Sequence, residues 1–224
     1  MVFNPTTYHL NRRLPRPTPC GDKAVALMRM FALTSDRLRE GNFELDCSLD
    51  IEPGDVVYVT GPSGSGKTTI LRELERRVPA ERRLNLADIE LPDDRPCIDC
   101  FDGDWMHAVR LLTRAGLGDV FNLLNRPALL SEGQRWRFRL AMAMSRRPGF
   151  IFADEFTSSL GRICALALAH QIRRWASTQD VIFILVGCHR DVLGELRPDV
   201  IVERDLANHT TVTYRDRRRN RTQK

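Results

Sequence analysis

The stretch GPSGSGKTT, residues 61–69, decides the fold of this chain, because an apolar run at 56–60 precedes it and a helix-compatible segment follows it. Gly61 and Gly66 permit tight turns, so that consecutive backbone N–H groups can close around a phosphate. The positive end of the following helix points at the same anion. The order strand, phosphate loop, helix is therefore predicted, in preference to a chance glycine- and serine-rich turn.

This phosphate loop (residues 61–69) predicts a site for a nucleoside triphosphate and Mg²⁺. Lys67 is expected to reach the β- and γ-phosphates and to act in catalysis, and the Thr68 hydroxyl is expected to bind Mg²⁺. The residues expected to bind the nucleotide are Gly61, Pro62, Ser63, Gly64, Ser65, Gly66, Lys67, Thr68 and Thr69.

Composition places the chain among globular proteins. Its 224 residues suffice for one large domain, with or without a subdomain, and no apolar run reaches membrane-spanning length. Residues 1–17 lack the apolar segment of a signal peptide, so a cytoplasmic location is expected. The six cysteines are scattered and are expected to be reduced thiols; Cys97 and Cys100 have the spacing of half a zinc site, with no second pair to complete it.

The basic charge is concentrated at the C-terminus. Residues 215–224 carry six basic groups and one acidic group, which together equal the whole formal net charge of +5. Two interpretations remain open: the tail contacts nucleic acid or an acidic partner, or it is a solvated, disordered terminus.

Local patterns predict the other elements. Prolines at 5, 15, 17 and 19 indicate that residues 1–22 form an extended arm, followed by a short helix within 23–34. Alternating polarity predicts an antiparallel strand at 43–49. Further elements are predicted as a strand at 83–91 and helices at 104–115 and 119–125, and the helices are expected to form a subdomain beside the main sheet.

Residues 130–134 read LSEGQ. Ser131 with Gln134 three positions later is a capping box, so a helix is predicted from here to 146. A capped helix start that contains Gly133 is a second candidate anion site. Taken alone, an ordinary helix cap explains the pattern better.

Residues 150–155, FIFADE, predict a buried parallel strand that delivers two carboxylates to its C-terminal edge. Asp154 is expected to hold Mg²⁺, and Glu155 to orient or deprotonate the attacking water. A second apolar strand, 181–186, ends at Gly187-Cys188-His189. His189 is expected on the same rim as the phosphate loop, where it can hydrogen-bond a γ-phosphate or the water.

These pieces, in this order, resemble the ATP-binding cassette (ABC) ATPases. GPSGSGKTT is similar to Walker A, LSEGQ to the ABC signature, FIFADE to Walker B, and His189 with its neighbours to the switch histidine. The resemblance implies an α/β P-loop NTPase fold with a RecA-like, mostly parallel core sheet, an antiparallel β arm and a small helical subdomain. It also implies that ATP binding joins two copies head to tail, as a homodimer in which Ser131, Gly133 and Gln134 of one subunit cap the γ-phosphate held by Lys67 of the other.

Several positions depart from the family pattern. The glutamine expected at the junction with the helical subdomain is absent, and Asp93 or Asp94 lies nearest; Asp93 is the candidate that could reach Mg²⁺ through water. Phe156 and Gly161 stand where the family has Pro and Asp. The adenine-stacking tyrosine has no clear counterpart, Phe31 being the candidate. Within the family, the chain looks most like soluble ATPases related to those fused to a GNAT-type acetyltransferase domain.

The expected organisation has five parts. They are an arm with a short helix (1–40), the β arm with the first part of the core (41–93), the helical subdomain with the signature (94–146), the second part of the core (147–214) and the basic tail (215–224). The leading hypothesis is a soluble ATPase that drives a conformational change on an unidentified protein partner. The alternatives are the ATP-binding subunit of an ABC transporter with a membrane permease, and an ATP-gated module that binds nucleic acid through the tail.

Overall fold

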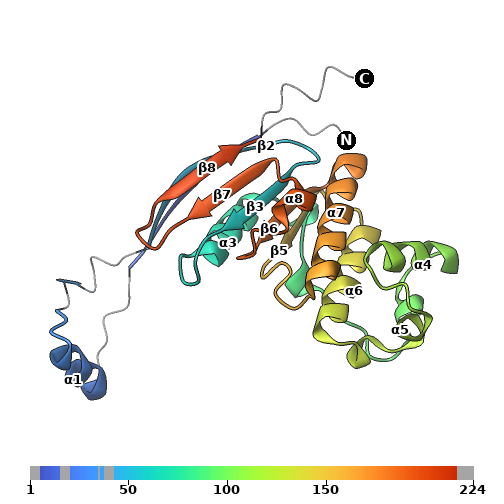
Figure 1. Cartoon of the computed structure of the whole chain (residues 1–224), viewed down its shortest axis with the longest axis horizontal. Helices are drawn as coiled ribbons and strands as arrows, with labels where there is room; N and C mark the ends of the chain where they lie inside the picture. The colour runs from blue at the N-terminus through green and yellow to red at the C-terminus, as the bar shows by residue number, and fades with distance from the viewer. Residues whose placement is uncertain (1–5, 16–20, 35, 38–42, 216–224) are drawn as a thin grey trace.

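The computed structural model, in which residues 6–15, 21–34, 36–37 and 43–215 are described, is built around a six-stranded sheet (Figure 1). The strand order is β4-β5-β6-β3-β7-β8, and every neighbouring pair is parallel except β7 and β8. This confirms the predicted α/β fold with a mostly parallel core sheet. The strands are β3 (Val56–Thr60), β4 (Arg83–Asn85), β5 (Phe150–Ala153), β6 (Ile182–Val186), β7 (Val200–Arg204) and β8 (Thr210–Tyr214).

Both faces of the sheet are covered, which explains why β3, β5 and β6 are buried at every residue. On one face, Val56 and Tyr58 join the hydrophobic cluster that contains α6 (Glu132–Ser145) and α7 (Arg162–Gln179). On the other face, Val57 and Val59 join the cluster that contains α3 (Lys67–Arg77). Alternate residues of one strand therefore belong to two separate halves of the core.

The antiparallel arm is a two-stranded sheet of β1 (Thr6–Leu14) and β2 (Phe43–Ile51). The pair is in register from Thr6 opposite Ile51 to Leu14 opposite Phe43. The strand predicted at 43–49 is confirmed. Residues 6–14, predicted only as part of an extended arm, form the partner strand, and Leu10 is buried with the α3 half of the core.

The predicted strand at 83–91 is wrong beyond Asn85. The Asn85 side chain accepts a hydrogen bond from the Ala87 amide, which turns the chain into a 3-10 helix. The helices predicted after the phosphate loop, at 104–115, at 119–125 and up to 146 lie near their predicted positions, and the helix predicted within 23–34, α1 (Asp22–Met30), ends before the predicted limit. The remaining helical elements are α1 (Asp22–Met30), α4 (Trp105–Arg114), α5 (Val120–Leu124), α8 (Leu193–Leu196), η1 (Ala80–Arg82), η2 (Leu86–Asp88), η3 (Cys97–Cys100) and η4 (Pro127–Leu129).

The helices of the signature region belong to the core half on one face of the sheet, and α4 packs against α6. Leu112 of α4 and Phe138 of α6 are buried in the same cluster as Val56 and Tyr58 of β3. Trp105, the first residue of α4, is 63% exposed. None of the helices in the described residues is both long and apolar enough to span a bilayer.

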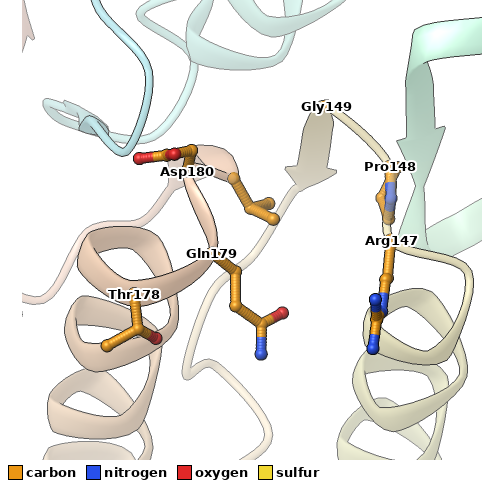
Figure 2. Close-up of a pocket in the computed structure, with 7 residues that line it drawn as sticks. Arg147, Pro148, Gly149, Thr178, Gln179 and Asp180 are labelled. Atoms are coloured by element: carbon orange, nitrogen blue, oxygen red, sulfur yellow. The ribbon is translucent and has the colours of Figure 1, made fainter. Parts of the chain in front are cut away.

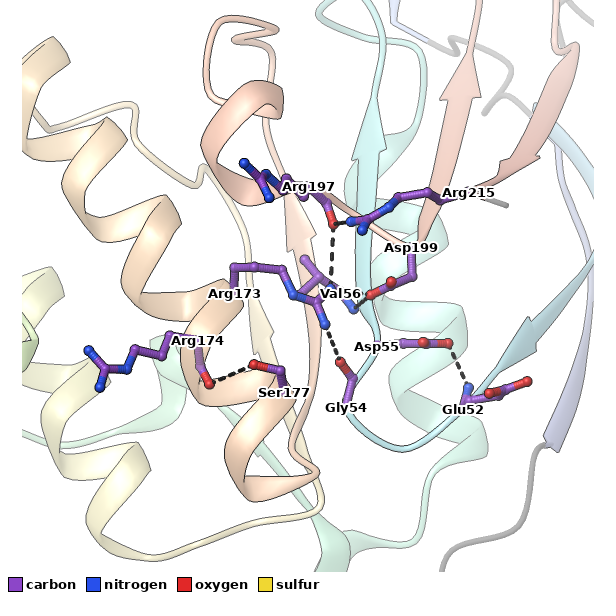
Figure 3. Close-up of polar contacts among 10 residues, drawn as sticks. All are labelled: Glu52, Gly54, Asp55, Val56, Arg173, Arg174, Ser177, Arg197, Asp199 and Arg215. Atoms are coloured by element: carbon purple, nitrogen blue, oxygen red, sulfur yellow. Dashed lines mark hydrogen bonds and ion pairs between the residues drawn. The ribbon is translucent and has the colours of Figure 1, made fainter. Parts of the chain in front are cut away.

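Hydrogen bonds and an ion pair connect the start of β3 to α7 and to Asp199, the residue before β7 (Figure 3). An Asp199 carboxylate oxygen accepts a hydrogen bond from the Val56 amide at 2.9 Å, and the same oxygen pairs with Arg173. Arg173 also donates to the Gly54 carbonyl at 3.2 Å. The turn before β3 is therefore held at a fixed distance from α7.

Replacing this arginine should lower stability. We expect Arg173→Leu to reduce the free energy of unfolding by about 1 to 3 kcal/mol, because Asp199 then loses a charged partner and the Gly54 carbonyl loses a donor. Urea unfolding followed by circular dichroism would measure the change. Arg174→Leu is the matched control at the neighbouring exposed position, with an expected change within about 0.5 kcal/mol. Equal losses in both variants would contradict the assigned role.

Candidate functional site

A cavity of about 450 Å³ lies at the C-terminal edge of the sheet, and three predicted motifs line it. The phosphate loop contributes Lys67 and Thr68, the end of β5 contributes Asp154 and Glu155, and the segment after β6 contributes His189. These residues are far apart in sequence and meet because β3, β5 and β6 are parallel neighbours whose carboxyl ends share one edge. The fold thus brings together the residues that are predicted to bind the phosphates, the Mg²⁺ and the attacking water.

Two glycines of the phosphate loop have no room for a side chain. Gly61 has a φ of 143°, and a Cβ there would lie 2.0 Å from the carbonyl oxygen of Arg204. Gly66 has a φ of 90°, and a Cβ there would lie 2.0 Å from the ring of Phe43. The Ser65 hydroxyl, in the same loop, is buried and has no hydrogen-bond partner among the described residues. A tight backbone cradle with an unused buried hydroxyl fits a phosphate group.

Lys67 lies folded over the phosphate loop. Its ammonium donates to the carbonyl oxygens of Gly61 at 2.9 Å and Pro62 at 2.8 Å, and the residue is buried. The charge is therefore held within the loop that is predicted to bind the phosphates.

Thr68 and Asp154 form the candidate metal site. The Thr68 hydroxyl donates to one Asp154 carboxylate oxygen at 2.7 Å, and the other oxygen accepts from the Glu155 amide at 2.9 Å. One hydroxyl and one carboxylate beside a phosphate cradle fit Mg²⁺, which takes few protein oxygens and keeps water and phosphate ligands. Asp93 is exposed and does not line this cavity, and its neighbour Asp94 pairs with Arg95 at 2.9 Å.

The turn after Asp154 has strained backbone angles and is held in place by a buried residue, Phe156. Glu155 has a φ of 51° and Thr157 a φ of 71°, both in the left-handed region that non-glycine residues seldom adopt. Phe156 between them is fully buried, its amide donates to the Val186 carbonyl at 2.7 Å, and its ring lies 5.7 Å from that of Trp136. Phe156 replaces the family proline, and its anchoring holds Glu155 at the cavity.

Tyr58 holds the histidine segment, and the sequence reasoning missed it. Its hydroxyl donates to the His189 carbonyl at 2.8 Å, and a Cβ on Gly187 would lie 2.4 Å from the Tyr58 hydroxyl oxygen. Burial raises the pKa of Tyr58, so it stays a neutral donor. The available signal was an aromatic hydroxyl in a buried strand whose other residues are three valines and a threonine.

The signature residues do not line this cavity. The capping box is present, with the Ser131 amide donating to the Gln134 side chain at 2.8 Å and the Gln134 amide donating to the Ser131 hydroxyl at 3.3 Å. Ser131 is exposed, whereas Gly133 is buried, and a Cβ on Gly133 would lie 2.7 Å from the Ser159 carbonyl. Close packing within its own subunit therefore explains why position 133 is a glycine.

Other predicted features lie away from the cavity. Phe31, the candidate for adenine stacking, follows α1, is 62% exposed and does not line it. Of the basic tail, residues 216–224 are outside the described residues. Cys97 is buried, and the described residues contain no cluster of three or more metal-binding side chains.

A second cavity, of about 380 Å³, lies between the C-terminal ends of α6 and α7 (Figure 2). Residues 147–149 and 178–181 line it, so it is at the start of β5 and β6, at the opposite edge from the phosphate loop. None of the predicted site residues contributes to it.

Comparison with known proteins identifies relatives of the chain. The sequence pattern of the family described as "AAA domain" matches residues 51–194. The chain is 33% identical over 177 residues to the aliphatic sulfonates import ATP-binding protein SsuB of Delftia acidovorans, covering 71% of this chain and 73% of that protein. It is 31% identical over 178 residues to the macrolide export ATP-binding/permease protein MacB of Syntrophobacter fumaroxidans, covering 62% of this chain. The match spans 25% of MacB's length.

A solved structure supports the fold. The dimeric post-hydrolysis structure of the ATP-binding cassette MJ0796 bound to ADP and Pi superimposes with a TM-score of 0.66 and 15% identity, covering 93% of this chain and 98% of that one. None of the three proteins supports the resemblance to the acetyltransferase-fused subgroup, which stays a prediction. The matched family pattern and the identity to SsuB show that this chain belongs to the ATP-binding cassette (ABC) family of P-loop ATPases.

Proposed function

We propose that the chain binds MgATP at the phosphate loop and hydrolyses it. The observation that carries this proposal is the contact between Thr68 and Asp154, at 2.7 Å, in a cavity that Lys67, Glu155 and His189 also line. A magnesium ion held there would neutralise charge on the β- and γ-phosphates. The backbone amides of the loop and the Lys67 ammonium then bind the phosphate oxygens.

The hydrolytic roles belong to the two residues at the far side of the cavity. Glu155 accepts a proton from the attacking water, and its backbone φ of 51° fixes the turn that presents the carboxylate. His189 donates a hydrogen bond to the γ-phosphate or the water, on a segment that Tyr58 holds through the backbone. Both roles require only that the side chains turn into a cavity that they already line.

The catalytic site is proposed to be completed by a second copy of the chain. Ser131 is exposed at the start of the 14-residue helix α6 and lies outside the cavity of its own subunit. A helix start is a favourable place for an anion. In a head-to-tail homodimer, Ser131, Gly133 and Gln134 of one subunit would face the γ-phosphate bound by the other.

The partner is proposed to be a membrane permease. SsuB and MacB are named as import and export ATP-binding proteins, which supports the transporter alternative better than a free-standing ATPase. The signature region also exposes apolar side chains, with Phe121 79% and Leu129 72% exposed. In the proposed division of the chain, these belong to the helical subdomain at 94–146. The cytoplasmic location stays a prediction.

Glu155→Gln tests the hydrolytic role. The amide cannot take a proton, so we expect the steady-state ATPase rate to fall by about a hundredfold or more, while ATP still binds. Size-exclusion chromatography with light scattering should then detect an ATP-dependent dimer. Glu90→Gln, at an exposed position outside the cavity, is the control and should retain the wild-type rate. A Glu155→Gln variant with the wild-type rate would disprove the mechanism.

Subunit mixing tests the composite site. Lys67→Ala removes the phosphate contact and Ser131→Arg blocks the signature, so each variant alone should lose most ATPase activity. A mixed dimer contains one site with an intact loop and an intact signature, because the two defects fall together in the other site. We expect activity to return on mixing. If the signature acts within its own subunit, no intact site forms and mixing restores nothing.

A pull-down tests the proposed permease. We expect Glu155→Gln in ATP to retain an integral membrane protein from detergent-solubilised membranes, because ATP-bound dimers engage the partner. Adding Phe121→Asp and Leu129→Asp should abolish retention without changing the ATPase rate of the otherwise wild-type chain, since both side chains are exposed. Leu206→Asp, at an exposed apolar residue beyond β7, should retain it. Retention of a soluble protein alone would favour the free-standing ATPase.

A further inference from the structure

Arg204, the last residue of β7, is fully buried behind the phosphate loop. Its guanidinium makes five hydrogen bonds, and every acceptor is a neutral oxygen. A buried charge without such partners would be strongly destabilising, so this set of contacts ties together the segments that supply them. The acceptors are the carbonyls of Glu44, Ser65 and Asn208, the Asn208 side chain and the Thr210 hydroxyl.

One of these contacts reaches the centre of the phosphate loop. Arg204 Nε donates to the Ser65 carbonyl at 2.7 Å. The peptide bond between Ser65 and Gly66 is planar and trans, so its carbonyl and its N–H point in opposite directions. A carbonyl held toward Arg204 therefore directs the Gly66 N–H away from Arg204, and Gly66 lines the nucleotide cavity.

The ring of Phe43 lies beside both Arg204 and Gly66. The Arg204 guanidinium carbon lies 4.3 Å from the centre of the Phe43 ring, a stacking distance. Gly66 also lies beside this ring, since a Cβ there would lie 2.0 Å from a ring carbon. Arg204, Phe43 and the Ser65–Gly66 peptide thus form one packed unit, and the arginine fixes its geometry.

We propose that Arg204 is a positioning residue for phosphate binding, which acts by holding the Ser65–Gly66 peptide with its N–H toward the nucleotide. The inference rests on the proposed binding of MgATP at this loop and adds a residue that does not touch the nucleotide. Without the hydrogen bond from Arg204, the Ser65–Gly66 peptide can rotate. Nucleotide binding must then also order this peptide, which makes the free energy of binding less favourable.

Arg173 offers a matched control, because the two arginines hold backbone carbonyls at opposite ends of β3. Arg173 donates to Gly54 before the strand, and Arg204 donates to Ser65 after it. Either replacement by leucine removes a partly or fully buried guanidinium, but only Arg204→Leu frees the phosphate loop. General destabilisation should affect both variants, whereas loss of positioning should affect one.

The experiment measures MgADP affinity by isothermal titration calorimetry and steady-state ATPase kinetics on folded wild type, Arg204→Leu, Arg204→Lys and Arg173→Leu. For Arg204→Leu we expect the MgADP Kd and the KM for MgATP to rise by about tenfold to a hundredfold, the effect of one hydrogen bond to a charged group. Because the loop binds ground and transition states alike, kcat should stay within about threefold. Arg204→Lys should be intermediate, since an ammonium can reach fewer acceptors and lacks the planar fork. Arg173→Leu should keep the wild-type Kd within about twofold.

Wild-type MgADP affinity in Arg204→Leu, or an equal loss in Arg173→Leu, would overturn the proposal. If circular dichroism shows that Arg204→Leu is unfolded, Arg204→Lys decides: wild-type affinity in that variant overturns the positioning role, and a raised Kd supports it. Failure of the wild-type chain to bind MgADP would instead overturn the proposed function on which the inference rests.

Discussion

The structure depends on the burial of β3 between β6 and β7 with both of its faces covered. No residue of this strand is exposed, and its alternate side chains belong to the two halves of the core. Such a strand has almost no freedom to shift, because a slip would place side chains in the wrong half. The phosphate loop that follows β3 therefore starts from a fixed point. The contacts of Arg173 before the strand and Arg204 after it extend that fixation to both ends.

One departure from the family pattern, Phe156, has a packing explanation in this chain. Phe156 fills the core beneath the carboxylates and contacts the ring of Trp136, so the signature helix α6 is joined to the end of β5. Gly133 at the start of that helix fits against the Ser159 carbonyl, in the turn that follows Phe156. A movement of the signature helix would therefore displace the turn that carries Glu155, because tightly packed side chains transmit displacement. In the proposed dimer, the signature and Glu155 of one subunit belong to different composite sites, so these contacts would link the two sites.

The local patterns were strong enough to predict most elements and several of the residues that line the cavity. The phosphate loop, the carboxylates after β5 and the histidine after β6 could be assigned to one rim, because parallel strands present their carboxyl ends at the same edge. The errors arose where local pattern was weak. The strand β1 has little alternation of its own and is defined by pairing with β2, and the run at 83–91 was interrupted by the Asn85 side chain.

The sequence by itself determined most of the elements around the phosphate loop and the main residues that line the cavity, since these follow from glycine spacing and apolar runs, and the order of its motifs carried the resemblance to the family. Only the tertiary structure decided which residues hold that cavity in shape. Tyr58, Phe43 and Arg204 act through partners 131, 23 and 139 residues away, respectively His189, Gly66 and Ser65. A contact between residues so far apart in sequence depends on strand order and packing, so a local sequence pattern cannot predict it.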